Sequence, residues 1–387
     1  MIKVSILIPV QEYLNSYRGG AIARWAYHAY NYEKPDYQFD ILGRTLNDNH
    51  DFKSIDSLTI ISKYNHLLNV LTRLPIIRTI FKPFISLIYL KIYRKNILAS
   101  EILEIHNSIE YIAKIRKLHF AGKIILHMHN DYLNKLSKES IHTLNSQINL
   151  LIFPSEAFKN EFLSIHPEFT KPVEVVYNGY DPKKFFPQKE GIPKANPVIG
   201  YVGRFDKNKN ILNLLDIYSA LLDKMPNLEF YLIGSGKSGG VENKYQRLVL
   251  KKIETMNRQN GKITYLGYVH NDQLCKYYNL FDLFISLPVH TEAFGMTFVE
   301  ALACKTLSIG TNLGGIPEAI GFNELLVNNP KDHMEVVDKT IKILSDETLY
   351  QSLVEKTFNY VSTNFQWEAI QVKQLKVLDQ VSQGNQE

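Results

Sequence analysis

The sequence predicts an α/β protein made of two domains. With 387 residues, the chain is long enough to form two hydrophobic cores. Residues 281–310 contain two buried strands, 281–286 and 306–310, with a loop and an apolar helix over 296–303 between them. Further short apolar runs end in polar or glycine-rich residues, as parallel strands do at a ligand-binding edge. This alternation indicates parallel sheets covered by helices.

Composition narrows the class of protein. The hydrophobic content of 45% and the charged content of 21% are typical of a globular protein, and the net charge of +5 is too small to indicate a partner. Cys275 and Cys304 form neither a disulfide framework nor a metal-ligand spacing, which favours a reducing compartment. No secretory leader and no apolar run of about 18 residues is evident. We therefore expect a cytoplasmic protein, with peripheral attachment to the inner face of the cytoplasmic membrane left open.

The first predicted strand, Val4 to Val10, leads to a pair of glycines, Gly19 and Gly20, that open a helix running to about Tyr30. A glycine-rich turn after a first strand binds phosphate in dinucleotide folds, because backbone N–H groups can approach the ligand there. The sequence lacks G-x-G-x-x-G, so a nicotinamide site is poorly supported. A plain turn from loop to helix is the alternative interpretation.

Residues 57–100 contain no Asp or Glu and combine basic with apolar side chains. Such a segment fits docking on an anionic membrane surface, where each basic residue contributes about 1 kcal/mol. Pro75 and Pro83 interrupt the segment, which further excludes a membrane span. The alternative is a pair of core helices with a solvated basic face. The basic residues are Lys63, Arg73, Arg78, Lys82, Lys91, Arg94 and Lys95.

Two more predicted strands, within 102–108 and 123–131, end in polar residues. We expect these residues near a ligand, because ligands bind at the carboxyl ends of strands in open α/β sheets. His127 and His129 point the same way on a strand, but no trio of ligands indicates zinc, so no metal is expected. For a single histidine, a structural role is the commoner alternative. The candidates at these ends are His106, Asn107, His129, Asn130 and Asp131.

Two glutamates, Glu292 and Glu300, lie on either side of the start of the helix predicted over 296–303. A helix N-terminus suits a diphosphate, Gly295 allows close backbone approach, and Thr297 adds a hydroxyl. Glu292 could reach a group attached to the diphosphate, and Glu300 could accept hydrogen bonds from a ribose. A pyrophosphate between two sugars describes a nucleotide sugar. The alternative is an amphipathic helix with solvated glutamates.

Residues 188–196 contain Pro, Gly and charges, which indicates a domain boundary. A second candidate phosphate site follows this segment. The next strand ends at Gly203, and Arg204 and Lys209 follow it in a loop. Two cations at a strand end suit a diphosphate, since arginine offers a fork and lysine a point charge. A cationic surface loop is the alternative.

Several phrases resemble the motifs of family 4 glycosyltransferases. EAFGMTFVEALAC is similar to that family's E-x-F-G-x-x-x-x-E-A-x-A, and GGIPEAI is similar to the G-G-x-x-E-x-I that follows. GRFDKNK resembles G-R-x-x-x-x-K, and NGYDPKKF resembles N-G-x-D-x-x-x-F. The resemblance covers most of the chain and is strongest from Val198 to Ile320. RGGAIARW, EIHNS and LHMHND also look like bacterial transferases that act on lipopolysaccharide core and related surface glycans.

This resemblance implies the GT-B fold, in which two Rossmann-like domains face each other across a donor cleft. Residues 1–190 would bind the acceptor, residues 191–365 would bind the nucleotide sugar, and a helix over 366–384 would pack back on the first domain. The implied activity is retaining, metal-independent transfer from a nucleoside-diphosphate sugar, most often UDP-linked, to a glycan or glycolipid. A sugar-nucleotide epimerase, a phosphorylase and a non-catalytic binding protein of the same fold are alternatives. A nucleic-acid-binding protein is disfavoured, because residues 57–100 are too apolar.

The resemblance also implies a role for each candidate residue. His129, with His127 as a substitute, would lie near the reacting carbon, and Glu292 would hold the donor sugar. Relatives often carry an acidic residue shortly after the glycine pair, whereas this chain has Ala23 and Arg24. His106, Asn107, Asn130 and Asp131 would lie on the acceptor side. The implied donor-binding residues are Gly19, Gly20, Arg204, Lys209, Tyr268, Val269, Phe294, Gly295, Met296, Thr297 and Glu300.

Overall fold

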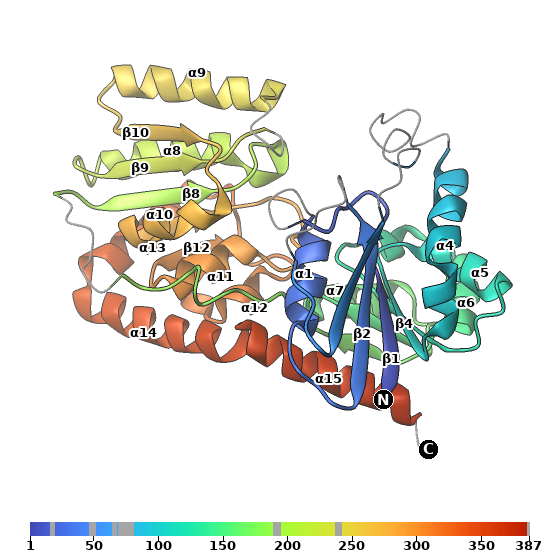
Figure 1. The fold of residues 1–387 in the computed structure, drawn as a ribbon. Coiled ribbons are helices and arrows are strands. Elements are labelled where there is room, and N and C mark those ends of the chain that lie inside the picture. Colours follow the sequence, from blue (N-terminus) through green and yellow to red (C-terminus); the bar gives the residue numbers. More distant parts are fainter. Residues whose placement is uncertain are drawn as a thin grey trace. The chain divides into compact units, whose positions relative to one another are not determined.

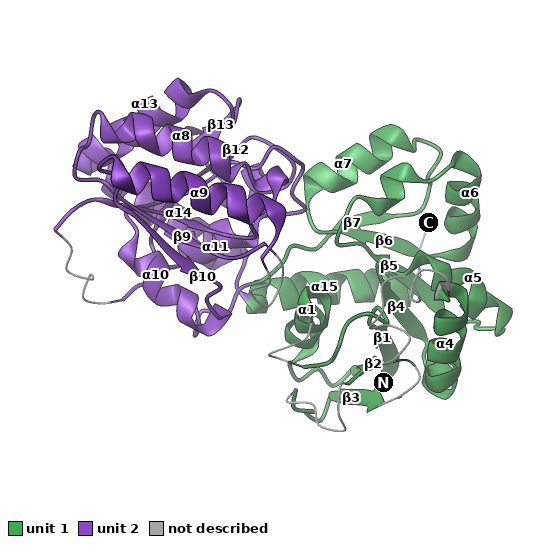
Figure 2. Ribbon diagram, turned by 90° about the horizontal axis from the view of Figure 1, so that it is seen from above, with its two compact units in different colours: residues 1–179, 367–387 green, residues 180–366 purple. Residues whose placement is uncertain are grey.

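The computed structural model describes residues 1–15, 20–45, 52–63, 68, 81–188, 195–236 and 242–384. The chain divides into two compact units, one formed by residues 1–179 with 367–387 and the other by residues 180–366 (Figure 2). Residues 180–190, expected in the N-terminal domain, therefore fall in the second unit. The physical reason is that the Tyr180 N–H donates to the Phe365 carbonyl at 2.8 Å, which ties this segment to the end of the second unit.

The first unit contains a parallel sheet with the strand order β3-β2-β1-β4-β5-β6-β7 among the described residues (Figure 1). β1 ends at Leu7, earlier than predicted, in keeping with Pro9, which has no N–H to donate to a neighbouring strand. The strands are β1 (Ile2–Leu7), β2 (Tyr37–Arg44), β3 (Leu58–Lys63), β4 (Ile102–His106), β5 (Lys123–His127), β6 (Leu150–Phe153) and β7 (Val173–Val175).

Helices cover this sheet, and the last helix of the chain is one of them. Ile370, Val377 and Leu378 of α15 are buried in the same core as β1, β2 and α1, so α15 belongs to the first unit. The helical elements are α1 (Ala21–Tyr30), α4 (Lys82–Ala99), α5 (Ile109–Lys117), η1 (Tyr132–Lys135), α6 (Lys138–Gln147), α7 (Glu156–Ile165) and α15 (Trp367–Gln383). No described helix has the length and apolar character needed to cross a membrane.

The second unit contains a parallel sheet with the strand order β10-β9-β8-β11-β12-β13 among its described residues. Its strands are β8 (Val198–Val202), β9 (Glu229–Ile233), β10 (Ile263–Gly267), β11 (Leu283–Ser286), β12 (Leu307–Thr311) and β13 (Leu326–Val327). The helical elements are η2 (Lys207–Lys209), α8 (Ile211–Leu222), α9 (Lys244–Arg258), η3 (Asn271–Gln273), α10 (Leu274–Leu280), α11 (Met296–Ala303), α12 (Ile316–Ile320), η4 (Asn323–Leu325), α13 (His333–Ser345) and α14 (Glu347–Asn364).

The two sheets share one topology, and this topology locates the candidate sites. In each sheet the first strand of the unit lies inside the sheet, with the second and third strands on one side of it and the fourth on the other. Ligands of such doubly wound folds bind beyond the carboxyl ends of the strands where the order reverses. These points lie after β1 and β4 in the first unit and after β8 and β11 in the second unit.

Candidate active site

In the second unit, the loops after β8 and β11 bring Lys209 and Glu292 together. The Lys209 Nζ lies 2.5 Å from the Glu292 Oε1, and both side chains are partly buried. The Val289 N–H also donates to the Asn208 carbonyl at 2.8 Å, so a backbone contact joins the two loops. The predicted cation and the predicted carboxylate are therefore neighbours, although they are far apart in the sequence.

Arg204, the other predicted phosphate ligand, has a side chain that is 68% exposed. Its Nη2 lies 3.7 Å from the Asp206 Oδ2, which is a weak ion pair in solvent. The Tyr201 hydroxyl donates to the Arg204 carbonyl at 3.0 Å and so fixes the backbone of the loop. A long, solvated guanidinium on a fixed backbone can reach a diphosphate without loss of structure.

Glycines determine the shape of the backbone at Glu292 and at the start of α11. Gly295 has a φ of 110°, which disfavours any residue with a Cβ, and no described side chain caps α11. The Gly315 N–H donates to the Glu292 carbonyl at 2.9 Å. A Cβ on Gly314 would lie 2.5 Å from that same oxygen. The glycine pair of GGIPEAI therefore holds the Glu292 backbone, a role that sequence reasoning missed although the pair itself was noticed.

Glu300 lies on α11, one turn beyond the helix N-terminus. Its Oε2 accepts a hydrogen bond from the Tyr278 hydroxyl at 3.0 Å, and the carboxylate is partly exposed. Burial, and then the nearby Glu300 charge, raise the pKa of Tyr278 well above its usual value, so Tyr278 stays a hydrogen-bond donor. Tyr278, which the sequence did not single out, thus orients the carboxylate predicted to bind a ribose.

The remaining residues of the second unit that are predicted to bind the donor are exposed or partly exposed to solvent, except for Phe294. Tyr268 is 54% exposed after β10, and Val269, Met296 and Thr297 are partly exposed. Phe294 is buried and meets Phe365 edge to face, with ring centroids 5.1 Å apart. The Phe294 side chain therefore contributes to the core, and the predicted contact with a donor could involve only its backbone.

In the first unit, three histidines gather at the ends of β4 and β5. The His106 Nδ1 lies 2.9 Å from the His129 Nε2, and the His127 ring lies 4.5 Å from the His129 ring between centroids. Trp25 of α1 packs against all three rings. The Asn107 Oδ1 accepts from the His129 backbone N–H at 2.7 Å, which fixes the loop that carries His129. The two predicted strand ends therefore form one cluster.

A fully buried carboxylate, Glu104, lies beneath the histidines. Its Oε1 is 3.0 Å from both the His127 Nδ1 and the His106 Nε2. Its Oε2 accepts from the Tyr30 hydroxyl and from the Gln374 Nε2 at 2.8 Å. Sequence reasoning missed Glu104, which follows two apolar residues of β4, and Gln374, which reaches the cluster from the distant helix α15.

The protonation states in this cluster follow from burial and contacts. Burial acts to raise the pKa of Glu104, but the hydrogen bonds from His106 and His127 outweigh it and hold the pKa well below its usual value. Burial lowers the pKa of His127 to about 4 and that of His129 well below its usual value. At neutral pH, Glu104 is therefore ionised, and His127 and His129 are neutral.

This charge assigns the tautomers. The His127 Nδ1 is hydrogen-bonded to the Glu104 Oε1, whereas the His106 Nε2 lies equally near without hydrogen-bond geometry. We assign a proton to both nitrogens, because a lone pair on either would face an ionised oxygen at 3.0 Å. With that proton on Nε2, the His106 Nδ1 acts as the acceptor and takes the N–H of the His129 Nε2. His129 consequently has its lone pair on Nδ1, where it can accept a hydrogen bond from a hydroxyl.

Among the described residues, these three histidines form a group that could hold a metal ion, because their ligand atoms lie within 4.8 Å of one another. Their rings are within 21° of parallel, however, so their lone pairs run side by side instead of converging on one point. Tetrahedral zinc requires convergent ligands. The geometry does not favour a metal here, and metal independence stays a prediction.

The start of α1 differs from the predicted phosphate site. Gly19 lies outside the described residues, and Gly20 precedes the first residue of α1. The Glu12 Oε2 accepts from the Ala23 N–H at 2.9 Å, and a Cβ on Gly20 would lie 2.0 Å from the Glu12 carboxyl carbon. Burial raises the pKa of Glu12. The protein's own carboxyl group thus occupies this helix terminus, and phosphate binding there stays a prediction.

Asn130 and Asp131 follow His129 into the helical turn η1. The Asn130 Oδ1 accepts from the Tyr132 N–H at 3.0 Å, and the Asp131 Oδ2 lies 3.4 Å from the Lys135 Nζ. Asn130 is exposed and Asp131 is partly exposed, so both side chains remain accessible to an acceptor.

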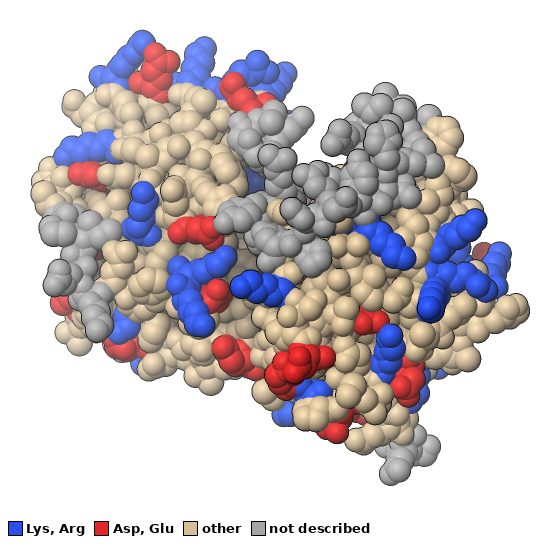
Figure 3. Space-filling view, viewed as in Figure 1, with Lys and Arg blue, Asp and Glu red and all other residues tan. Residues whose placement is uncertain are grey.

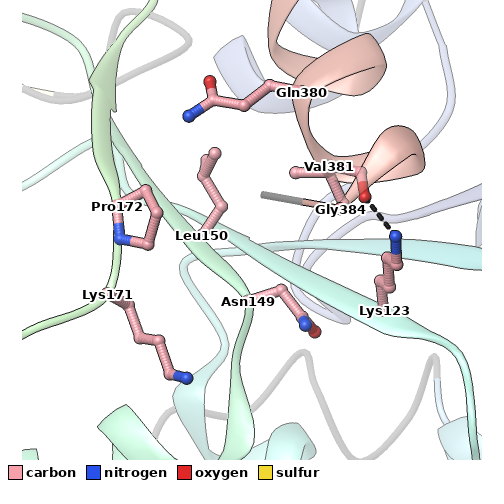
Figure 4. A pocket seen from close by; sticks show the side chains of 8 residues that line it. All are labelled: Lys123, Asn149, Leu150, Lys171, Pro172, Gln380, Val381 and Gly384. Carbon is pink, nitrogen blue, oxygen red and sulfur yellow. Dashed lines mark hydrogen bonds between the residues drawn. The ribbon is translucent and has the colours of Figure 1, made fainter. Parts of the chain in front are cut away.

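A hollow of about 170 Å³ lies elsewhere in the first unit (Figure 4). Lys123 begins β5, and Asn149 directly precedes β6, so the hollow is at the amino ends of these strands, away from the histidines. The Lys123 Nζ already donates to the Val381 and Ser382 carbonyls at the end of α15. This lysine stabilises a helix C-terminus, so the hollow is separate from the candidate site.

Comparison with known proteins supports the glycosyltransferase interpretation. Residues 182–360 match the family described as glycosyl transferases group 1. A lipopolysaccharide 1,2-N-acetylglucosaminetransferase of Salmonella typhimurium is 25% identical over 280 residues, covering 70% of each chain. An N-acetyl-alpha-D-glucosaminyl L-malate synthase of Bacillus anthracis is 25% identical over 289 residues, covering 70% of this chain and 72% of that protein.

Solved structures agree on the fold. A sucrose-phosphate synthase of Thermosynechococcus elongatus has a TM-score of 0.74 at 17% identity and covers 99% of this chain and all of its own. An Anabaena protein solved with UDP and glucose has a TM-score of 0.70 at 17% identity, covering 98% of this chain and all of its own. The chain has the GT-B fold, and residues 182–360, almost the whole second unit, carry the signature of the group 1 glycosyltransferases.

Proposed function

We propose that this chain transfers a sugar, with retention and without a metal, from a UDP-linked donor to a glycan or glycolipid. The observation that carries this proposal is the contact between Lys209 and Glu292 at the carboxyl ends of β8 and β11. It places a cation and a carboxylate beside the N-terminus of α11, which also carries Glu300. These groups match the diphosphate, the sugar and the ribose of a nucleotide sugar.

Each group has a separate task in the proposed reaction. Arg204, Lys209 and the N-terminus of α11 stabilise the negative charge that develops on the leaving diphosphate. Glu300, oriented by Tyr278, accepts hydrogen bonds from the ribose. Glu292 holds hydroxyls of the transferred sugar, and His129 accepts a hydrogen bond from a substrate hydroxyl. In this scheme the diphosphate competes with Glu292 for the Lys209 ammonium, so donor binding releases the glutamate for the sugar.

The acceptor class rests on two observations. One relative is, by its name, a transferase that acts on lipopolysaccharide, which is a glycolipid. Helix α4 also exposes an apolar face: Phe81, which precedes the helix, Phe84 and Leu87 are 45%, 50% and 54% exposed and follow one another at three-residue spacing. Large exposed apolar groups on one side of a helix indicate an interaction surface.

Basic residues continue this surface toward the end of α4. Lys91, Arg94 and Lys95 are exposed on the same helix, and Lys and Arg side chains lie over α4 and α5 on the face shown in Figure 3. The opposite side of α4 is anchored, since the Tyr89 hydroxyl donates to the Ile8 carbonyl at 2.7 Å. Residues 64–67 and 69–80 of the predicted docking segment lie outside the described residues. From the exposed apolar and basic side chains of α4 we infer that this helix docks on an anionic lipid surface.

Nucleotide binding tests the donor site. The intact chain is mixed with UDP, GDP, ADP and their sugars, with magnesium or with a chelator, and the shift in Tm is measured. We expect one nucleotide to raise Tm equally in both conditions. Lys209→Gln should remove most of this shift, whereas Lys207→Gln, a change at an exposed lysine of the same turn, should keep it. A shift that needs magnesium, or one that survives Lys209→Gln, would contradict the proposed site.

Product analysis tests the reaction. With a donor that shifts Tm, the anomeric proton of the transferred sugar is followed by NMR in the presence of lipopolysaccharide-type acceptors. The proposal expects the product to keep the anomeric configuration of the donor. Conversion of the donor to an epimer, or a requirement for inorganic phosphate, would favour an epimerase or a phosphorylase of the same fold.

A further inference from the structure

The two cysteines of the chain meet between α10 and α11. The Cys275 Sγ lies 3.8 Å from the Cys304 Sγ, and both residues are buried. The chain contains no other cysteine. A disulfide has sulfur atoms about 2.05 Å apart, so a small movement of the two side chains and helices would allow a bond.

This thiol pair lies next to the contact that orients Glu300. Cys275 and Tyr278 are three residues apart on α10, and Glu300 and Cys304 are four residues apart at the end of α11. Residues at these spacings lie on the same side of a helix. The two helices are therefore joined by two adjacent contacts, Cys275 with Cys304 and Tyr278 with Glu300. A change at the first contact acts directly on the second.

Cys275 is separated from solvent by a surface segment around Phe186. Its Sγ lies 3.5 Å from the Phe186 carbonyl, and Phe186 itself is 45% exposed. Asn279 holds this segment in place, because its Nδ2 donates to the Phe186 carbonyl at 3.0 Å and its Oδ1 accepts from the Gln188 N–H at 2.8 Å. A small oxidant needs only a local displacement of this surface segment to reach the sulfur.

The two thiols are not equivalent. The contact with Cys304 lowers the pKa of the Cys275 thiol to about 6, and the same contact raises the pKa of Cys304. The thiolate is the nucleophile in thiol chemistry. Cys275 is therefore the thiol that reacts first, and Cys304 is placed to react second.

We propose that a peroxide converts Cys275 and Cys304 into a reversible disulfide, and that this bond weakens nucleotide binding at Glu300. The Cys275 thiolate attacks one peroxide oxygen, the O–O bond breaks, and a sulfenic acid and hydroxide form. The hydroxide takes up the proton that the Cys275 thiol released and becomes water. The Cys304 sulfur then attacks the Cys275 sulfur, the S–O bond breaks, and a second water leaves. Both sulfurs are oxidised and the peroxide is reduced. A dithiol reductant reverses the reaction by thiol–disulfide exchange.

Peptide mapping tests the bond independently of any function. The intact reduced chain is treated with hydrogen peroxide, alkylated, digested and analysed by mass spectrometry. We expect the peptides of Cys275 and Cys304 to be joined, with the loss of two hydrogen atoms, and to separate after dithiothreitol. Unmodified thiols, separately oxidised cysteines or cross-linked dimers as the main product would overturn the proposal.

Binding measurements test the consequence, which rests on the proposed function of Glu300. We expect peroxide to weaken the affinity of the wild-type chain for the nucleotide at least fivefold, and dithiothreitol to restore it. Cys275→Ser and Cys304→Ser should bind like the reduced wild type before and after peroxide. If the disulfide forms and the affinity is unchanged, the coupling to Glu300 is wrong. If no nucleotide binds even the reduced chain, the donor site itself is wrong, although the mapping result stands.

Discussion

The charge on Glu104 determines which nitrogen of each neighbouring histidine carries a proton. Its Oε1 faces His106 and His127, and its Oε2 is held by Tyr30 and Gln374. A buried carboxylate with so many donors is stable only while all of them point toward it. The orientation of His129, which contacts a substrate hydroxyl in the proposed reaction, therefore depends on a residue that touches no substrate.

The tautomer of His129 is a direct prediction of this arrangement. In a ¹H–¹⁵N spectrum of the histidine-labelled chain at neutral pH, His129, assigned with His129→Gln, should be protonated on Nε2 and unprotonated on Nδ1. Glu104→Gln removes the charge that fixes the tautomers, so it should reduce this form and lower kcat about tenfold, with little change in the KM of the donor. Glu101→Gln, a change at an exposed glutamate just before the same strand, is the control. A wild-type signal for protonated Nδ1 would refute the assignment.

Helix α4 shows what sequence patterns can and cannot establish about an element. The basic and apolar composition of residues 57–100 left a membrane surface and a pair of core helices as alternatives. Part of the segment is the strand β3, and the α4 side chains divide into an anchored side with Tyr89 and an exposed side with Phe84 and Leu87. The sequence cannot make this division, because the packing partners of α4 come from distant residues such as Ile8.

Vesicle binding tests the exposed side of α4. The chain should sediment with vesicles that contain phosphatidylglycerol, bind pure phosphatidylcholine weakly, and lose binding as salt rises. The double change Phe84→Ser and Leu87→Ser should reduce binding at least fivefold without lowering Tm, because both side chains are exposed. Met334→Ser, at a residue that is 60% exposed in the second unit, should leave binding unchanged. Equal binding to both kinds of vesicle, or full binding by the double variant, would refute the docking surface.

Across the molecule, prediction succeeded where local patterns carry the information. The alternation of strands and helices predicted the two parallel sheets, and the motifs singled out Lys209 and Glu292, which the structure brings into contact. It failed where distant segments meet. Nothing near Glu104 in the sequence indicates that Gln374 will hold it, and nothing near Glu12 indicates that its carboxyl group will fill the start of α1. Such contacts depend on the folded core and not on local propensity.

The first unit should therefore be sensitive to acid. The pKa of His127 is about 4 in the folded chain, below the usual value of about 6.5, so between these pH values the unfolded chain binds more protons. Stability must then fall as the pH falls through this range. The pKa of Glu104 is also depressed in the folded chain. The stability that Glu104 contributes is therefore fully present above the pKa of glutamate in the unfolded chain, and it is lost as the pH falls toward the folded pKa.

From pH 7 to pH 5, His127 alone should lower the free energy of unfolding of the first unit by about 2 kcal/mol. Tryptophan fluorescence during urea unfolding measures this unit selectively, because the two tryptophans of the chain, Trp25 and Trp367, both belong to it. His127→Gln should reduce the loss on acidification, whereas His119→Gln, at an exposed histidine, should not. If the His127 variant folds too poorly, titration of the wild-type His127 by NMR gives the same answer, and a pKa near 6.5 would show that burial does not control this cluster.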